Sequence, residues 1–114
     1  MSAWSIPVES FSSVTLTSML QTGTAIDLHR VGTDHAVEYI LGVVTNDSWS
    51  VSLQGSLDGA DWYDIGGAYS GTEGGAPTTI AVVETATFKP ARFIRATGSA
   101  SVGSPTVTAL VTSR

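Results

Sequence analysis

The chain has 114 residues, with ten Asp and Glu against five Lys and Arg, and it has no cysteine. Its length allows one hydrophobic core, its net charge of −5 argues against nucleic acid as a partner, and the lack of cysteine excludes disulfides and thiolate metal sites. Because charged residues make up only 13% of the chain, much of its surface must be Ser, Thr, Gly or apolar side chains, which suits a surface that makes contacts.

No targeting or membrane-spanning segment is predicted. The first thirty positions hold no continuous apolar stretch, and no basic residue precedes Arg30, so the pattern of a signal peptide is missing. The most apolar run, residues 39–44, is far shorter than the ~20 residues that a membrane span requires. We therefore expect no membrane partner.

Residues 1–22 are predicted to form an extended N-terminal arm, and residues 23–114 a single folded domain. The arm carries apolar side chains among serines, without a turn signal that would fold it back as a hairpin. Its larger apolar residues are Trp4, Ile6, Val8, Phe11, Val14 and Leu16. Such an arm would be held in place by neighbouring molecules.

The rest of the chain has an all-β pattern, because strong helix formers are scarce and several short stretches alternate between apolar and polar residues. Residues 24–28 are predicted to form a short strand. Residues 36–44 are predicted to form a central strand, because both of its faces are largely apolar. The turn-forming residues 46–48 then predict an antiparallel hairpin to the next strand.

The clearest strand is residues 49–56, in which every second side chain is apolar. Asp58 and Gly59 follow, and because glycine accepts the positive φ of a tight turn, they predict a hairpin to a short strand that begins at Trp62. Neighbouring residues of a strand face opposite sides. Of Trp62 and Tyr63, we therefore expect one in the core, and we assign that place to Trp62.

Residues 66–77 are rich in Gly, Ser and Thr and show no periodicity, so they are predicted to form a long loop that carries Tyr69 as a candidate contact residue. Three further strands are predicted at residues 78–84, 92–97 and 106–112. About seven strands at this spacing indicate an antiparallel β-sandwich, with jelly-roll and immunoglobulin-like strand orders both open.

The sequence predicts no catalytic or metal site. Each histidine, His29 and His35, lies near an aspartate, but the spacing fits no helix-borne ligand pair and no third strong ligand is evident. Further aspartates could attract Ca²⁺, but the full calcium-loop pattern is missing and aspartate is a common turn residue. The aspartates are Asp27 and Asp34 beside the histidines, and Asp47, Asp58, Asp61 and Asp64 near the turns. Without a nucleophile elbow or a triad context, we expect a protein that is not an enzyme and holds no cofactor.

Arg92 and Arg95 lie three residues apart on one predicted strand, which places them on opposite faces. One of them is expected to pair with a carboxylate near the sheet edge. The other is expected to face solvent or a partner.

Three segments together resemble small β-sandwich proteins of tailed-phage virions. They are the hairpin at 51–65 with its Gly-Ser-x-Asp-Gly-x-x-Trp pattern, the Arg-Phe-Ile-Arg strand at 91–96, and the alternating Thr and Val of 106–111. The resemblance covers roughly residues 36–112. It implies a capsid decoration (cement) protein or another head or tail subunit, with no catalytic residues to transfer. Similar hairpin and arginine-strand patterns occur in bacterial sugar-binding and cell-surface sandwiches.

The resemblance further implies a homotrimer that is made in the host cytoplasm and located on the virion, where it binds the major capsid protein on the outer surface of the head. The arm and one end of the sandwich are expected to make the contacts. The candidate contact residues are Trp4, Ile6, Phe11, Tyr69 and Arg95. The alternative is a carbohydrate- or receptor-binding module of a phage tail or cell surface, which would use Tyr63, Tyr69 and the acidic loop.

Overall fold

A computed structural model of the chain describes residues 4–43, 47–73, 78–86 and 89–114. These residues form nine β-strands and no helix. No helix among them is therefore long and apolar enough to span a membrane. The strands are β1 (Val8–Thr15), β2 (Gln21–Thr22), β3 (Ile26–Gly32), β4 (His35–Val43), β5 (Asp47–Ser56), β6 (Tyr63–Glu73), β7 (Thr78–Ala86), β8 (Ala91–Val102) and β9 (Thr106–Ser113).

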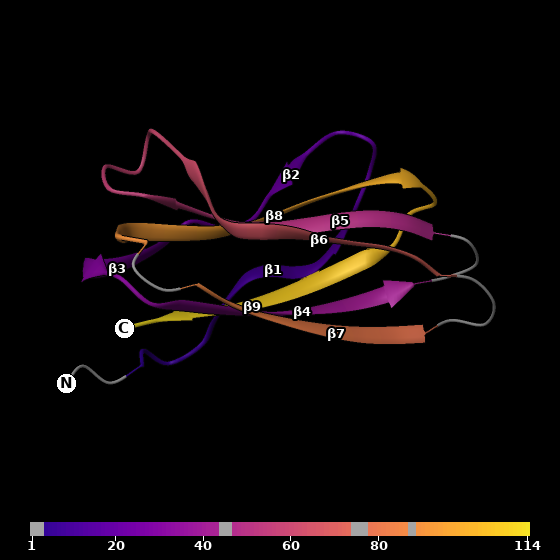
Figure 1. The fold of residues 1–114 in the computed structure, drawn as a ribbon. Coiled ribbons are helices and arrows are strands. Elements are labelled where there is room, and N and C mark those ends of the chain that lie inside the picture. The colour runs from indigo at the N-terminus through magenta and orange to yellow at the C-terminus, as the bar shows by residue number, and fades with distance from the viewer. Residues whose placement is uncertain (1–3, 44–46, 74–77, 87–88) are drawn as a thin grey trace.

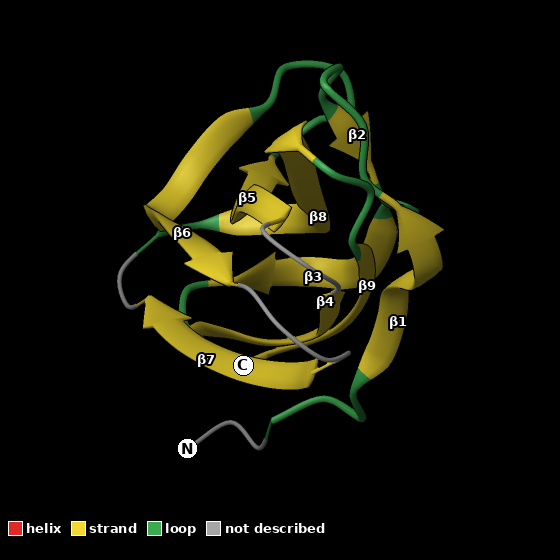
Figure 2. Ribbon diagram, turned by 90° about the vertical axis from the view of Figure 1, so that its right-hand side faces the viewer, coloured by secondary structure: helices red, strands yellow, loops and turns green. Residues whose placement is uncertain are grey.

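The strands form two antiparallel sheets that pack face to face (Figure 1). The first sheet has the order β1-β9-β4-β7. The second sheet has the order β2-β8-β5-β6, and β3 pairs with the N-terminal part of β8. In Figure 2 the two sheets curve around a common interior. The predicted antiparallel β-sandwich is confirmed.

The strand order is that of a jelly roll. The first half of the chain pairs with the second half in nested order: β1 with β9, β2 and β3 with β8, β4 with β7, and β5 with β6. The chain thus resembles one long antiparallel ribbon, closed at the β5–β6 hairpin and wrapped into two sheets. Of the two strand orders left open by the sequence, the structure has the jelly roll.

The predicted hairpin between β4 and β5 is wrong, although both strands are present. β4 lies between β9 and β7 in the first sheet, which confirms its predicted central place, whereas β5 lies in the second sheet. Turn-forming residues indicate that the chain changes direction. They do not indicate which sheet the next strand enters. Two strands with apolar faces can bury those faces against each other equally well from opposite sheets of the sandwich.

The predicted separation of an arm at residues 1–22 is also wrong, because β1 belongs to the sandwich. It pairs with β9 along its length, and the side chain of Phe11 is only 1% exposed. Leu16 just after β1 is also buried. Two register shifts interrupt the pairing, and Ser13 has a φ of 48°, so the strand lacks a simple alternating pattern. No local turn signal marks this strand, because its partner is at the other end of the chain.

Residues 66–73 were predicted to lie in a long loop, but they belong to β6. A register shift in the β5–β6 pairing and a φ of 71° at Gly66 show a bulge there. Gly71 leaves room for an indole, since a Cβ at this position would lie 2.7 Å from Cζ2 of Trp49. Gly71 therefore serves strand packing here. Residues 74–77 of the predicted loop lie outside the described residues.

The interior of the sandwich consists of the alternate residues of strands from both sheets, as the pattern of residues 49–56 predicts. The inward-facing side chains include Val37, Tyr39, Leu41, Trp49, Val51, Leu53, Ile94, Ala96, Val107, Ala109 and Val111. The strands predicted at 78–84, 92–97 and 106–112 are confirmed as β7, β8 and β9, with longer bounds. The strand predicted at 24–28 is present as β3, which begins two residues later and extends to Gly32.

Candidate functional site

His35 and Ser113 form a serine–histidine pair, but both are fully buried. Nε2 of His35 lies 2.6 Å from the carbonyl oxygen of Lys89, and Nδ1 lies 2.9 Å from Oγ of Ser113. Because a carbonyl only accepts, Nε2 of the ring donates to Lys89. The hydroxyl of Ser113 donates to the carbonyl oxygen of Asp34 at 3.0 Å, and its Oγ also contacts Nδ1. A substrate cannot reach this pair. It ties the start of β4 to the end of β9.

The pH dependence of stability is expected to report this buried ring. Burial lowers the pKa of His35 from its ordinary value of 6.5, against the opposing hydrogen bond to Lys89 and the charge of Asp34. The unfolded chain therefore takes up a proton at a pH where the folded protein does not. The free energy of unfolding should be level above pH 6.5 and should fall as the pH decreases below it.

Urea unfolding followed at several values between about pH 5 and about pH 8 measures this slope. The variant His35→Gln should lose the slope, and His29→Gln, which changes an exposed histidine, should keep it. An unchanged slope in His35→Gln would show that another group is responsible.

Asp27 is the partner of Arg92 rather than a metal ligand. Its two carboxylate oxygens accept from Nε and Nη2 of Arg92 at 3.0 and 3.1 Å, and these bonds, with the backbone N–H of His29, lower the pKa of Asp27 to about 2. The pair joins β3 to β8, which confirms the prediction that one of the two arginines meets a carboxylate at a sheet edge. Among the described residues, no three His, Asp or Glu side chains gather as a possible metal site.

The aspartates near the turns are dispersed along β5 and its hairpin. Asp47 is buried at the start of the strand, and Asp58 lies beyond its other end. Because each strand residue adds about 3.3 Å, the two aspartates are roughly 30 Å apart. Oδ1 of Asp58 accepts from the backbone N–H groups of Ala60 and Asp61, both at 2.9 Å, which lowers its pKa to about 2. This carboxylate holds the predicted hairpin turn, and its contribution to stability is lost as the pH falls from 3.8 toward 2.

The first described residues, up to the start of β1 at Val8, form an apolar strip along the end of β9. The backbone N–H of Ser5 donates to the carbonyl of Ser113 at 2.7 Å, and its hydroxyl accepts from the N–H of Ser113 at 3.0 Å. Next to this anchor, Ile6 is 85% exposed, Trp4 41% and Val8 43%. We call Trp4, Ile6 and Val8 the N-terminal strip. The guanidinium of Arg114 lies 4.7 Å from the centroid of the Trp4 ring, so the C-terminal residue also contacts the strip.

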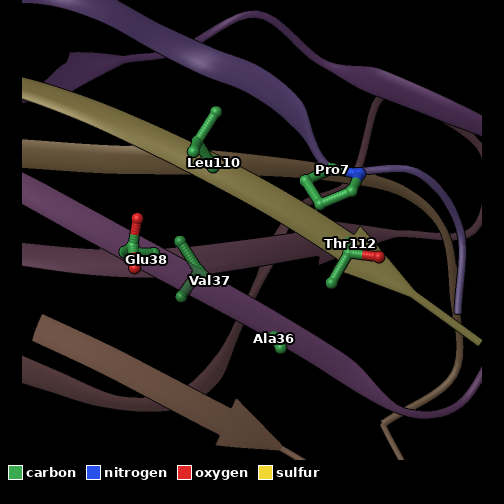
Figure 3. Close-up of a pocket in the computed structure, with 6 residues that line it drawn as sticks. All are labelled: Pro7, Ala36, Val37, Glu38, Leu110 and Thr112. Carbon is green, nitrogen blue, oxygen red and sulfur yellow. The ribbon is translucent and has the colours of Figure 1, made fainter.

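A shallow groove of about 190 Å³ continues the strip onto the outer side of the first sheet (Figure 3). Pro7 and Thr112 lie at one end of it in Figure 3, and Leu110 lies farther along β9. Its lining is Pro7, Ala36, Val37, Glu38, Leu110 and Thr112. The surface here is mainly apolar, with one carboxylate.

The five predicted contact residues do not form one surface. Trp4 and Ile6 are exposed on the N-terminal strip, whereas Phe11 is buried in the core and cannot reach a partner, which corrects its prediction. Tyr69 is partly exposed on β6, and Arg95 lies on the other sheet from the strip. The period-two alternation of apolar and polar residues does not reveal that Phe11 faces inward, because the bulges of β1 shift its register.

The sugar site predicted from Tyr63 and Tyr69 is only partly available. Both are half-exposed on the edge strand β6, but the hydroxyl of Tyr63 donates to the carbonyl of Pro90. Burial also raises the pKa of Tyr63.

Trp62 was assigned to the core, and this assignment is wrong. Gly55 pairs with Tyr63 and Gln54 with Asp64, so the side chain of Trp62 shares the outward direction of Asp64. The guanidinium of Arg95 lies 4.0 Å from the centroid of its ring. Counting back from the apolar Ile65 would have placed Tyr63 inward and Trp62 outward.

Comparisons with known proteins identify no relative: no family model matches the chain, and no curated protein or solved structure matches it. Two surfaces carry side chains that could bind a partner. They are the exposed apolar residues of the N-terminal strip at the first sheet and the Arg95–Trp62 stack on the second. A functional assignment therefore rests on what these surfaces can bind.

Proposed function

We propose that this protein is a non-enzymatic structural subunit of a tailed-phage virion, which decorates the outer surface of the head and stabilises it by binding the major capsid protein. The proposal rests on the N-terminal strip and on the resemblance of residues 36–112 to small virion proteins. Jelly rolls recur in viral capsids and also in lectins, so the fold alone does not choose between these roles.

The observation that carries the proposal is that the strip is both apolar and fixed. Ser5 holds the backbone against β9, so Ile6 is exposed at a defined position instead of on a freely moving end. Burying one such side chain against a partner contributes about 1.5–3 kcal/mol. Repetition of a modest contact over a lattice of identical sites gives a strong total attachment.

The strip predicts how single substitutions change attachment to heads. Ile6→Asp should reduce co-sedimentation with heads at least tenfold, because it places a charge in the contact. The particles to use are heads, stripped of decoration, of the phage that encodes the chain. Met19→Asp is the matched control, since the substitution adds the same charge at a residue that is 75% exposed and lies beyond the opposite end of β1.

Equal sedimentation of the two variants, both shown to be folded, would remove the strip from the mechanism. Failure of the unchanged protein to sediment with heads would contradict the proposed function itself. Removal of residues 2–20 is not a useful test, because it deletes β1 with the buried Phe11.

The proposed subunit assembles as a homotrimer, as the resemblance to decoration proteins implies. Sedimentation equilibrium of the purified protein tests this, with an expected mass three times that of the 11.8-kDa chain. A monomer at high concentration would contradict the trimer without affecting attachment to heads.

A further inference from the structure

Arg95 is held in one position without a carboxylate partner among the described residues. Its Nε–H donates to Oε1 of Gln54 at 3.0 Å, and its guanidinium stacks on Trp62. Arg92 and Arg114, in contrast, each pair with an aspartate. A guanidinium also has N–H donors on both terminal nitrogens. The stack therefore fixes the plane of a cation whose outer donors have no partner in the described part of the chain.

The surface beside Arg95 is lined by hydroxyl and amide side chains. On β5, the outward positions 50, 52 and 54 are serine, serine and glutamine, and the pairing with β8 places polar residues opposite these three. Oγ of Ser52 and Oγ1 of Thr97 lie 2.6 Å apart. Thr97 is itself buried, so the accessible groups are those around it. We define the hydroxyl face as the partly exposed residues Ser50, Ser52, Gln54, Arg95 and Ser99.

We propose that the hydroxyl face binds an acidic oligosaccharide. Its carboxylate pairs with the terminal nitrogens of Arg95, since a planar guanidinium and a carboxylate form two parallel charge-assisted hydrogen bonds. Its hydroxyls bond to the partly exposed serine side chains of the face, each of which donates and accepts. In the strand register, Gln54 lies between Arg95 on β8 and Asp64 on β6. The carboxylate of the sugar therefore binds at the β8 side, away from Asp64.

The composition of the face favours a sugar over other partners. The centre of a protein interface is enriched in aromatic residues and methionine, whereas the outward positions of β5 from 48 to 54 hold only serine and glutamine, and Trp62 at the border of the face is stacked on Arg95. A nucleic acid requires several cations along its backbone, whereas the face as defined has one cation, Arg95. A ligand with one carboxylate and many hydroxyls matches this set of groups.

The site goes beyond the proposed attachment to heads and does not depend on it. The N-terminal strip lies along the first sheet, and the hydroxyl face is the outer side of the second sheet (Figure 1). A subunit attached through the strip would leave this face free for glycans on a cell surface.

The test uses the isolated full chain on an array of oligosaccharides that carry uronic or sialic acid, printed beside neutral oligosaccharides of equal length and a set of acidic peptides. We expect binding to acidic sugars and none to neutral ones. The best sugar is then titrated calorimetrically against variants. Arg95→Lys, which keeps the charge but loses the planar fork, should weaken binding at least tenfold, and Ser50→Val severalfold.

Arg92→Lys is the matched control, because it changes an arginine of the same strand that is already paired with Asp27. Thermal unfolding of each variant shows that the fold is retained. An array without acidic sugar binding, binding of the acidic peptides alone, or equal affinity of Arg95→Lys and Arg92→Lys would each overturn the proposal. None of these outcomes bears on attachment to heads, which the Ile6 variant tests separately.

Discussion

Replacing Phe11 by alanine is expected to lower the free energy of unfolding by about 3–5 kcal/mol, the usual cost of removing a buried phenyl ring. The side chain is 1% exposed and belongs to the core cluster, although it lies in a segment that resembles a free arm in sequence. Since small domains have a total stability of about 5–15 kcal/mol, the variant should lose a large fraction of its stability. Equilibrium unfolding in urea measures the change.

Ile6→Ala is the control for this experiment. It removes an apolar side chain from the same end of the chain, but one that is largely exposed, so the free energy of unfolding should change by less than about 0.5 kcal/mol. If both variants were equally stable, β1 would not contribute to the core in solution, and residues 1–22 would form the arm that the sequence suggests.

Gly103→Ala should also be strongly destabilising, by about 2–4 kcal/mol, for two reasons that add. The residue has a φ of +79° in the turn between β8 and β9, a conformation that side chains with a Cβ rarely adopt. A Cβ there would also lie 1.7 Å from Oδ1 of Asp47, which is itself buried. The buried carboxylate would have to move from its place at the start of β5.

Gly67→Ala provides the comparison, because a Cβ at this position meets no atom within 4 Å and no positive φ is involved. Its thermal midpoint should stay within a few degrees of the unchanged protein or rise slightly, since alanine narrows the unfolded ensemble. A Gly103→Ala variant that is as stable as Gly67→Ala would contradict the described turn.

The end of β9 joins several parts of the chain that are distant in sequence. Ser113 contacts Ser5 before β1 and His35 at the start of β4, and Arg114 pairs with Asp34. The N-terminal strip is therefore built on the element that closes the fold. Protonation of the buried His35 should weaken the anchor of the strip along with global stability, so the proposed attachment to heads is expected to weaken in acid as well.

Local sequence was sufficient for the features that depend on neighbouring residues. The alternation in residues 49–56 gave β5 and its inward face correctly, and Asp58 with Gly59 predicted the hairpin to β6. Both signals act within a few residues, because strand pleating has a period of two and a tight turn requires specific backbone angles. The all-β class follows from the same short-range chemistry.

The tertiary structure decided everything that depends on pairing between distant segments. Which sheet receives β5, whether β1 is an arm or a strand, and the jelly-roll order all rest on contacts between the two halves of the chain. Bulges in β1 and β6 change which residues of these strands face inward. In β1 the result is that Phe11 is buried. The Arg95–Trp62 stack likewise joins β8 to the end of the β5–β6 hairpin across more than thirty residues. Sequence spacing carries no record of such contacts, because burial of apolar area is non-directional and several strand orders can satisfy the same pattern.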